Sequence, residues 1–363
     1  MKKTLAIAIC ALLAATAAEA KTYYVDASRP NNNGNGLKLA AAKKTIQAAI
    51  NLARDGDTVL VYPGEYFAPI KTYNRKITVK AVKGASKTTI VKPTNKHNLA
   101  MAQLGKTWTI AYTDPQGQTI SFSSTPYTTG KSTTLQGFLL DGKNRAGNYE
   151  PLLALSGGSV KSCSVRRLGH GDGLETLVAV NATLLKCTVM GNHAAIADNS
   201  TFIRCRILDN EERWDDSAFY KSVLRNCLIA GNRFQGSSGY ASHFATSTLV
   251  NCTIAKNRTR CGSAPFSHKS KYYNCILRNN WRGETGQTVH NTDSDNTYNW
   301  TNKTNQDPKF VDEGKGNYKL SKNSMCIDNG KVQAAIKSAV GSLDLAGAKR
   351  IRGQDIDRGC YEH

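Results

Sequence analysis

The sequence has 363 residues, a formal net charge of +21 and 40% hydrophobic residues. The charge favours polyanionic partners such as acidic polysaccharide, nucleic acid or an anionic membrane surface, although a general basic bias would produce it as well. After the N-terminal apolar run, no stretch approaches the ~20 apolar residues of a membrane-spanning helix, which excludes a helical membrane domain.

The beginning of the chain has the pattern of an export signal. Two lysines precede an apolar run, and Ala18-Glu19-Ala20 at its end is a small-x-small cleavage site. We therefore expect residues 1–20 to be a signal peptide that is removed before Lys21. The mature protein is expected to be secreted or periplasmic, soluble and monomeric, with no transmembrane segment.

A short amphipathic helix is expected next. Apolar residues recur at the i, i+3, i+4, i+7 spacing of one helix face, at Ile46, Ala49, Ile50 and Ala53. An Asp-Gly pair at 55 and 56 ends this pattern. Such a helix could cover the end of a stack of repeats, which otherwise exposes apolar core and unpaired strand edges.

The middle of the chain repeats one phrase, of which "LVNCTIAKNR" at residues 249–258 is a copy. Six cysteines mark the copies at separations of 24, 18, 22, 25 and 23 residues: Cys163, Cys187, Cys205, Cys227, Cys252 and Cys275. Such a period is typical of solenoids, in which each unit buries its apolar face by stacking on its neighbours. The residue two positions after each cysteine is apolar, and this period of two indicates a strand whose cysteine faces inward.

An asparagine follows five residues after the later cysteines, at Asn192, Asn210, Asn232, Asn257 and Asn280. Asparagine tolerates the left-handed backbone conformation, so we expect it at a corner between two strands, and stacked asparagines can bond one another. A leucine-rich repeat would need a leucine framework and a helical segment per unit, which are missing. We therefore predict an all-β fold, a parallel β-helix. The β-helix and its N-terminal cap are expected in residues 21–304 and a C-terminal cap in 305–363.

Both ends of the mature chain support this prediction. The opening "TYYVD", "TIQAAI" and "GDTVLVYPGEY" and the closing "DPKFVDEGKGNYKLSKNSMCIDNG" and "GQDIDRGCYEH" resemble the secreted right-handed parallel β-helix proteins of the pectin-lyase-like superfamily. The resemblance covers nearly all of the mature chain and implies their fold. It does not imply one activity, because such scaffolds host lyases, hydrolases, epimerases and non-enzymatic surface proteins.

Functional side chains are expected directly after the corner asparagines. The residues there are His193, Glu211, Arg233, Arg258 and Trp281, and those two positions further on are Ala195, Arg213, Gln235, Arg260 and Gly283. If the coils stack in register, these residues form two columns with a cationic strip that matches an acidic polysaccharide, because guanidinium groups grip carboxylate or sulfate and an aromatic face stacks on a sugar ring. His193, Arg213, Arg260 and Trp281 are the expected substrate-binding residues. The structural alternative is a solvated corner whose arginines support loops.

Cleavage of the polymer by β-elimination would need a base and a cation that neutralises the uronate. In some β-helix lyases, the resemblance implies, lysine or arginine is the base and calcium is the cation. Arg233, Arg258, Lys256, His243 and His268 are the catalytic candidates, the histidines because imidazole titrates close to neutral pH. No acidic cluster for calcium is evident near the strip, so no cofactor is evident and calcium stays an option. Two functions remain open: a polysaccharide lyase, and a non-catalytic surface adhesin or glycan-binding protein.

Two other activities find weaker support. A hydrolase needs facing carboxylates. "GHGDG" at 169–173 resembles a polygalacturonase element only superficially and "EERWDDS" at 211–217 offers carboxylates, but the other motifs of that family are missing. No nucleic-acid-binding module is recognisable.

The cysteines are expected to be structural. The six in the repeats are predicted to be small buried apolar side chains, and they lack the paired short spacings of zinc sites. Cys326 and Cys360 lie in the closing segment and are candidates for a disulfide in an exported protein.

Overall fold

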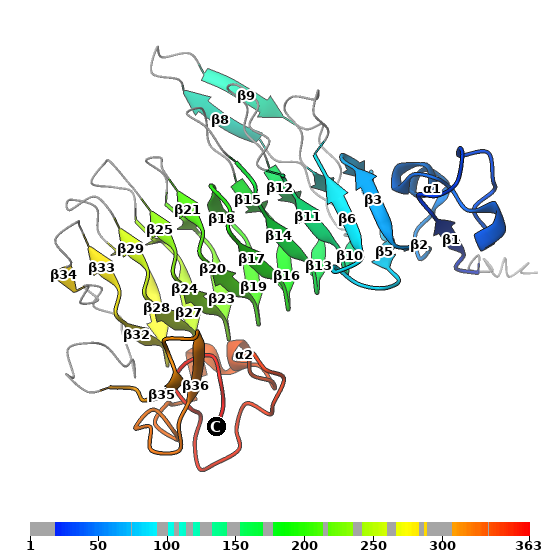
Figure 1. Cartoon of the computed structure of the whole chain (residues 1–363). Coiled ribbons are helices and arrows are strands. Elements are labelled where there is room, and N and C mark those ends of the chain that lie inside the picture. The colour runs from blue at the N-terminus through cyan, green and yellow to red at the C-terminus, as the bar shows by residue number, and fades with distance from the viewer. Residues whose placement is uncertain are drawn as a thin grey trace, which may run out of the picture.

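The chain winds into a stack of coils whose strands form long parallel sheets (Figure 1). The computed structural model describes residues 19–73, 75–92, 101–104, 109–113, 119–123, 133–143, 153–169, 177–212, 217–234, 242–259, 266–282, 287–288, 307–332 and 334–363. Each strand in the long sheets pairs in parallel with the strand one coil away, so this is a right-handed parallel β-helix. The structure thereby confirms the predicted fold.

Four sheets run along the stack in the described residues, and we call them A, B, C and E. Sheet A contains β1 (Thr22–Val25), β2 (Thr58–Val61), β5 (Thr78–Ala81), β10 (Thr134–Gln136), β13 (Ser159–Lys161), β16 (Thr183–Leu185), β19 (Thr201–Ile203), β23 (Val223–Arg225), β27 (Thr248–Val250) and β31 (Lys271–Tyr273). Sheet B contains β3 (Gly64–Phe67), β6 (Thr88–Val91), β11 (Leu139–Asp141), β14 (Ser164–Arg166), β17 (Thr188–Met190), β20 (Arg206–Leu208), β24 (Leu228–Ala230), β28 (Thr253–Ala255) and β32 (Ile276–Arg278).

Sheet C contains β4 (Ile70–Lys71), β7 (Ala102–Gln103), β12 (Leu153–Ser156), β15 (Leu177–Val180), β18 (Ala195–Asp198), β22 (Phe219–Tyr220), β26 (Phe244–Ala245) and β30 (Ser267–His268). Sheet E is shorter and contains β21 (Glu211–Glu212), β25 (Arg233–Phe234), β29 (Arg258–Thr259), β33 (Trp281–Arg282) and the antiparallel β34 (Gln287–Thr288). A separate antiparallel hairpin joins β8 (Thr109–Thr113) to β9 (Thr119–Ser123).

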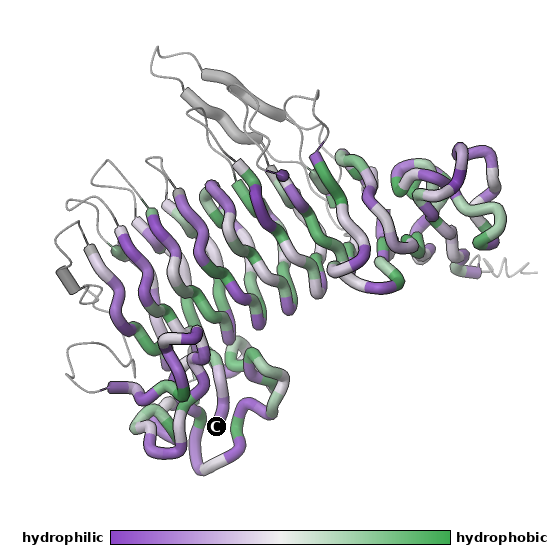
Figure 2. Tube along the Cα trace, in the orientation of Figure 1, coloured by the Kyte–Doolittle hydropathy of each residue, from purple (hydrophilic) through white to green (hydrophobic). Residues whose placement is uncertain are grey.

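The core fills the inside of the coils. Inward positions of sheets A and B stack apolar side chains of successive coils, as in Leu184, Phe202 and Leu224, whereas polar residues alternate with them along the strands (Figure 2). The six repeated cysteines are buried and free, and they stand at the corner between sheets A and B. Burial of each such side chain contributes ~1–3 kcal/mol, so stacking of the coils stabilises the whole solenoid.

The five corner asparagines form a buried ladder between sheets B and E. The side-chain amide of each rung donates to the Oδ1 atom of the next, at 2.8 Å for Asn192, Asn210 and Asn232 and at 3.0 Å for Asn257. The expectation that these asparagines adopt the left-handed conformation is wrong. The residue before each of them does so instead, such as Gly231 (φ 71°) and Lys256 (φ 55°), because the asparagine side chain has to point inward to bridge the coils.

The N-terminal helix α1 (Ile46–Leu52) covers the first coil, preceded by the 3₁₀ helix η1 (Leu39–Ala41). The Thr45 hydroxyl caps the helix by accepting a bond from the Ala48 N–H, at 3.3 Å. Ile46 and Ile50 are buried in the continuous core of the β-helix. The helix thus lies where the amphipathic pattern predicted it, at the start of the stack (Figure 1).

The C-terminal segment packs on the side of the last coils. It contains the antiparallel hairpin of β35 (Phe310–Asp312) and β36 (Asn317–Leu320), followed by η3 (Ala334–Ile336) and α2 (Lys337–Val340). Its apolar residues meet outward side chains of sheets A and B, including Val250, Leu228 and Ile276. In Figure 1 it lies against the strands near β28 and β32. This segment therefore covers a flank of the β-helix.

Candidate functional site

The residues after the corner asparagines form one column on sheet E. Glu211 pairs with Arg233, Arg233 with Arg258 and Arg258 with Trp281, and a single bridge joins His193 to Glu211. Strands in a sheet lie ~4.8 Å apart, so neighbouring members of the column can contact one repeating ligand. We call these five residues the sheet E column.

The column faces outward because the alternate positions of sheet E face the core. Phe234 is 3% exposed and Thr259 is 1% exposed, whereas Arg233 is exposed and Trp281 is 37% exposed. Arg258 between them is half-buried. The ladder asparagines fix the backbone immediately before each of these side chains, so the column stands on a rigid support.

The two ends of the column differ in charge. At the first end, the His193 Nδ1 and Glu211 Oε2 atoms lie 3.7 Å apart. Burial raises the pKa of Asp209, and the nearby Arg233 opposes this shift, which places a second carboxyl group beside Arg233. An anionic ligand is therefore favoured at the Arg258–Trp281 end and disfavoured at the His193–Glu211 end. The sequence prediction placed His193 and Glu211 next to each other in the column but did not identify the approach of their side chains.

Lys256 points away from this column. Its Nζ atom donates to the backbone oxygen of Glu313 at 3.0 Å and lies 3.9 Å from that residue's Oε1 atom. Lys256 thus links the corner of the coil to the C-terminal hairpin. The structure therefore gives this candidate base a structural contact.

His243 does not belong to the accessible surface. It is fully buried, its Nδ1 atom lies 2.8 Å from the Thr259 hydroxyl, and its ring packs on Phe234 and Phe266 with centroids at 4.3 and 4.5 Å. Burial lowers the pKa of His243 to about 3. The prediction that His243 could act as a base toward a polymer is wrong for this conformation, because the coil turns the side chain into the core.

The remaining predicted site residues are dispersed or lie outside the described residues. His268 is half-buried on sheet C, in register with Ala245, so it is on a different sheet from the column. Ala195, the first member of the second predicted column, is buried in β18. Arg213 and Arg260, together with His170, Asp172, Gln235 and Gly283, lie outside the described residues.

The asparagines before the later cysteines hold the C-terminal segment. The Asn226 amide donates to the Val340 carbonyl at 2.8 Å, and the Asn274 amide donates to the Lys331 carbonyl at 2.9 Å. These side chains are buried. Held in this way, the two side chains are not available to a ligand at the surface.

Cys326 and Cys360 are free and buried in two separate apolar clusters, one with Ile276 and Leu320 and the other with Leu228 and Tyr361. The candidate disulfide between them is not formed. Each thiol instead packs against a different outward strand of the β-helix, so the segment is anchored by apolar contacts.

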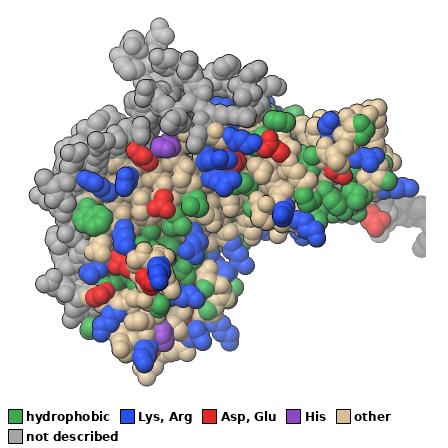
Figure 3. Space-filling model, in the orientation of Figure 1, with side chains coloured by type: hydrophobic (Ala, Val, Ile, Leu, Met, Phe, Trp, Pro, Cys, Tyr) green, Lys and Arg blue, Asp and Glu red, His purple; other side chains and the backbone are tan. Residues whose placement is uncertain are grey.

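In the described part of the chain, no group of three or more His, Cys, Asp or Glu side chains is arranged to hold a metal ion. Nor does any helix there have the length and apolarity to span a membrane. On the face in Figure 3, Lys and Arg side chains are spread over the coils and the C-terminal segment, with acidic side chains among them. The arrangement of the column suits binding of a carboxylate or sulfate group beside a ring that stacks on an aromatic side chain.

No protein-family model and no curated protein matches this chain. Among solved structures it is similar to the pectate lyase Pel9A, at 15% identity and a TM-score of 0.48, over 94% of this chain and 96% of that protein. It is also similar to a rhamnogalacturonan lyase (12% identity, TM-score 0.45, 74% and 75% covered) and to the pectin methylesterase PemA from Erwinia chrysanthemi (11%, 0.34, 84% and 99%). At these identities and TM-scores the likenesses carry no argument about activity.

Proposed function

We propose that this protein is exported and binds an acidic polysaccharide along the sheet E column. The observation that carries the proposal is the register of Arg233, Arg258 and Trp281 on neighbouring coils. Two guanidinium groups can donate hydrogen bonds to acidic groups of one chain, and the indole can stack on a sugar ring. The net charge of +21 adds a long-range attraction for a polyanion.

Binding is better supported than cleavage by the residues that the structure describes. A guanidinium keeps its proton across the working range of pH, His243 is buried, and Lys256 is held by Glu313. None of the five candidate bases combines a group that titrates near neutral pH with a position that faces the sheet E column. β-Elimination remains the second candidate because two adjacent guanidinium groups can neutralise a uronate carboxylate, which makes the carbon-bound proton next to it more acidic.

The experiment is salt-dependent retention of the mature protein on immobilised acidic polysaccharides, with a neutral polysaccharide as the reference. Arg258→Gln and Trp281→Ala should each weaken retention by about tenfold, the loss expected for one charge-assisted contact or one stacked ring. Glu211→Gln should strengthen it about twofold to fivefold, because it removes a repelling carboxylate from the column.

Lys80→Gln is the matched control, because Lys80 is an exposed cation on the outward face of sheet A. If Lys80→Gln and Arg258→Gln weakened retention equally, the net charge alone would explain the binding, which would contradict the proposal. The same polymers are followed by the ultraviolet absorbance of unsaturated uronate ends, with and without calcium. A rise that disappears in Arg233→Ala or Arg258→Ala would replace the binding proposal with a lyase.

A further inference from the structure

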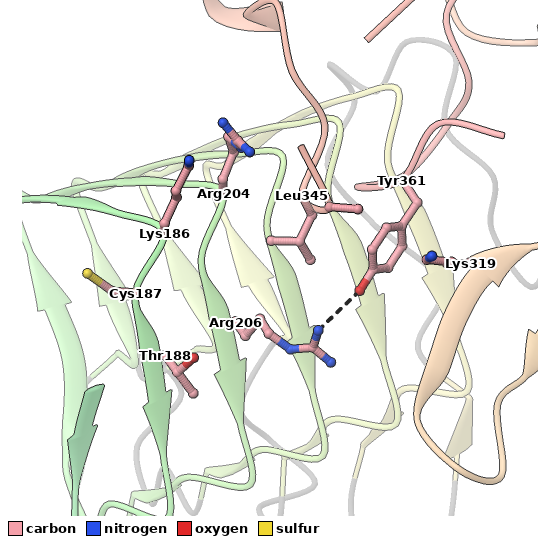
Figure 4. Close-up of a pocket in the computed structure, with 9 residues that line it drawn as sticks. Lys186, Cys187, Thr188, Arg204, Arg206, Lys319, Leu345 and Tyr361 are labelled. Atoms are coloured by element: carbon pink, nitrogen blue, oxygen red, sulfur yellow. Dashed lines mark hydrogen bonds between the residues drawn. The ribbon is translucent and has the colours of Figure 1, made fainter. Parts of the chain in front are cut away.

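A pocket of about 320 Å³ lies between sheet B and the C-terminal segment, away from the sheet E column. Lys186, Arg204 and Arg206 line it from the β-helix, and Lys319, Leu345 and Tyr361 line it from the C-terminal segment (Figure 4). Two parts of the chain that are far apart in sequence thus build one pocket. The sequence prediction did not identify it, because no repeat predicts where the C-terminal segment docks.

The charged side chains that line this pocket are all basic. Lys186 and Arg204 directly precede the repeated cysteines Cys187 and Cys205 in neighbouring coils. Each of the two has a left-handed backbone conformation, with φ 55°. Arg206 points outward from β20, and Lys319 lies on β36. Four like charges around one small space repel each other, so the docked arrangement is favoured when an anion lies between them.

Both arginines line this space, and their guanidinium groups are hydrogen-bond donors. Arg204 Nε is a buried atom without a hydrogen-bond partner among the described residues, and buried donors are normally paired. Its guanidinium group lies against Gly347 at the rim of the C-terminal segment. Arg206 Nη1 donates to the Tyr361 hydroxyl at 3.4 Å, which orients that guanidinium toward the pocket (Figure 4). A planar guanidinium fits carboxylate, sulfate and phosphate groups with two parallel bonds.

The rest of the pocket wall suits a small organic body. Leu345 is half-buried, and Tyr361 is 7% exposed with its ring in an apolar cluster that includes Leu228. The nearest carboxylate on the same loop, Asp344, is occupied by the N–H groups of Gly347, Ala348 and Glu362, at 2.7, 2.7 and 3.0 Å. Asp344 is thus held by its own loop and is not among the residues that line the pocket.

We propose that this pocket binds an oxyanion carried on a ring of monosaccharide size, such as a sugar acid, a sugar sulfate or a sugar phosphate. Arg204 and Arg206 hold the oxyanion, Lys186 and Lys319 add charge, and Leu345 and Tyr361 contact the ring. Because both parts of the chain contribute, the bound anion also ties the C-terminal segment to the β-helix. This site is independent of the sheet E column and does not rest on the function proposed for it.

The test is titration calorimetry of the mature protein with galacturonate, galactose 6-sulfate and galactose 6-phosphate, together with inorganic sulfate and neutral galactose. At least one sugar oxyanion should bind more tightly than inorganic sulfate, and galactose should not bind. Arg206→Gln and Lys319→Gln should each weaken binding about tenfold. Lys315→Gln, an exposed lysine of the same hairpin outside the pocket, should leave it unchanged.

Hydrogen exchange gives a second readout that does not depend on a variant. The bound oxyanion should slow exchange in residues 342–348 and 358–361, which border the pocket, and not in β33 of the column. Binding of galactose as strong as that of its acidic forms, binding of inorganic sulfate alone, or equal affinity in Lys319→Gln and Lys315→Gln would overturn the proposal. If Arg206→Gln does not fold, the exposed Lys319 carries the test.

Discussion

Lys21 would be the first residue of the protein after the predicted signal cleavage, and the structure describes its contacts. Its backbone nitrogen lies 2.7 Å from Asp57 Oδ1, and the other carboxylate oxygen accepts the Arg54 N–H at 2.7 Å. Asp57 is 5% exposed. Cleavage before Lys21 would turn this backbone N–H into a charged α-ammonium group on a buried carboxylate, which would convert a hydrogen bond into an ion pair.

We predict that Asp57→Asn lowers the free energy of unfolding of the processed protein by about 2 kcal/mol, because a charge-assisted bond is lost. Urea unfolding measures the loss, and intact mass identifies Lys21 as the first residue. A form with two extra residues before Lys21 is the control and should lose less, because it has no α-ammonium group there. Equal losses in both forms would disprove the ion pair.

At the scale of the structural element, the asparagine ladder should be cooperative. Asn232 accepts bonds from the Asn210 N–H and amide at 3.0 and 2.8 Å, and donates to Ile207 O and Asn257 Oδ1 at 3.0 and 2.8 Å. Asn280 accepts from Asn257 and donates to Ile254 O, and it has no further rung above it among the described residues. An interior rung therefore has partners on both sides.

We predict that Asn232→Ala lowers the free energy of unfolding by about 3 kcal/mol or more, because it leaves several buried polar groups unpaired, and that Asn280→Ala costs about half as much. Equilibrium denaturation of both variants gives the comparison. Equal costs would show that each rung acts alone, which would contradict a continuous ladder.

The buried cysteines of the repeats predict how the stability of the protein depends on pH. Burial raises the pKa of Cys205, Cys227 and Cys252 well above the ordinary thiol value. In the unfolded chain these thiols ionise near pH ~8.5. Below that pH both states hold the proton and stability does not change on this account, whereas above it the unfolded state alone loses protons and is favoured.

We therefore predict that the free energy of unfolding falls as the pH rises from ~8 to ~9.5, and that iodoacetamide does not modify these thiols in the folded protein at neutral pH. Cys205→Ala should be less stable overall but show a shallower decline. Rapid modification of the thiols in the folded protein, or an equally steep fall of stability with pH in Cys205→Ala, would contradict burial of these cysteines.

The sequence predicted the elements better than the site. Cysteine and asparagine spacings predicted coils and corners because each coil repeats the same local contacts, and the register of Arg233, Arg258 and Trp281 followed from that repeat. The direction of a side chain in an irregular part did not follow. His243 is preceded by a segment outside the repeat and turns inward, and the partner of Lys256 is a residue 57 positions away in the chain.

At the scale of the whole molecule, the sequence indicates where the C-terminal segment packs, although the spacing of the repeats alone does not. The outward position that begins the strands of sheet B is occupied in successive coils by Ser164, Thr188, Arg206, Leu228, Thr253 and Ile276. The first polar residues give way to Leu228 and Ile276, which are fully buried under the segment, and Thr253 between them is buried there too, where its hydroxyl accepts the Cys360 N–H at 3.1 Å. An outward position that becomes apolar along a solenoid indicates a covered flank.

This arrangement makes the last prediction. Leu228→Ser, on the outside of the β-helix, should destabilise the protein like a core substitution, by about 2–4 kcal/mol, because it leaves a cavity between sheet B and the segment. Thr188→Ser, at the same position of the strand two coils earlier, should cost less than about 0.5 kcal/mol because only a methyl group at the edge of the pocket is lost. Denaturation and hydrogen exchange of residues 307–363 measure both effects. If the segment held to the β-helix mainly through its polar bonds to Asn226 and Asn274, Leu228→Ser would leave exchange there unchanged and this interpretation of the covered flank would be wrong.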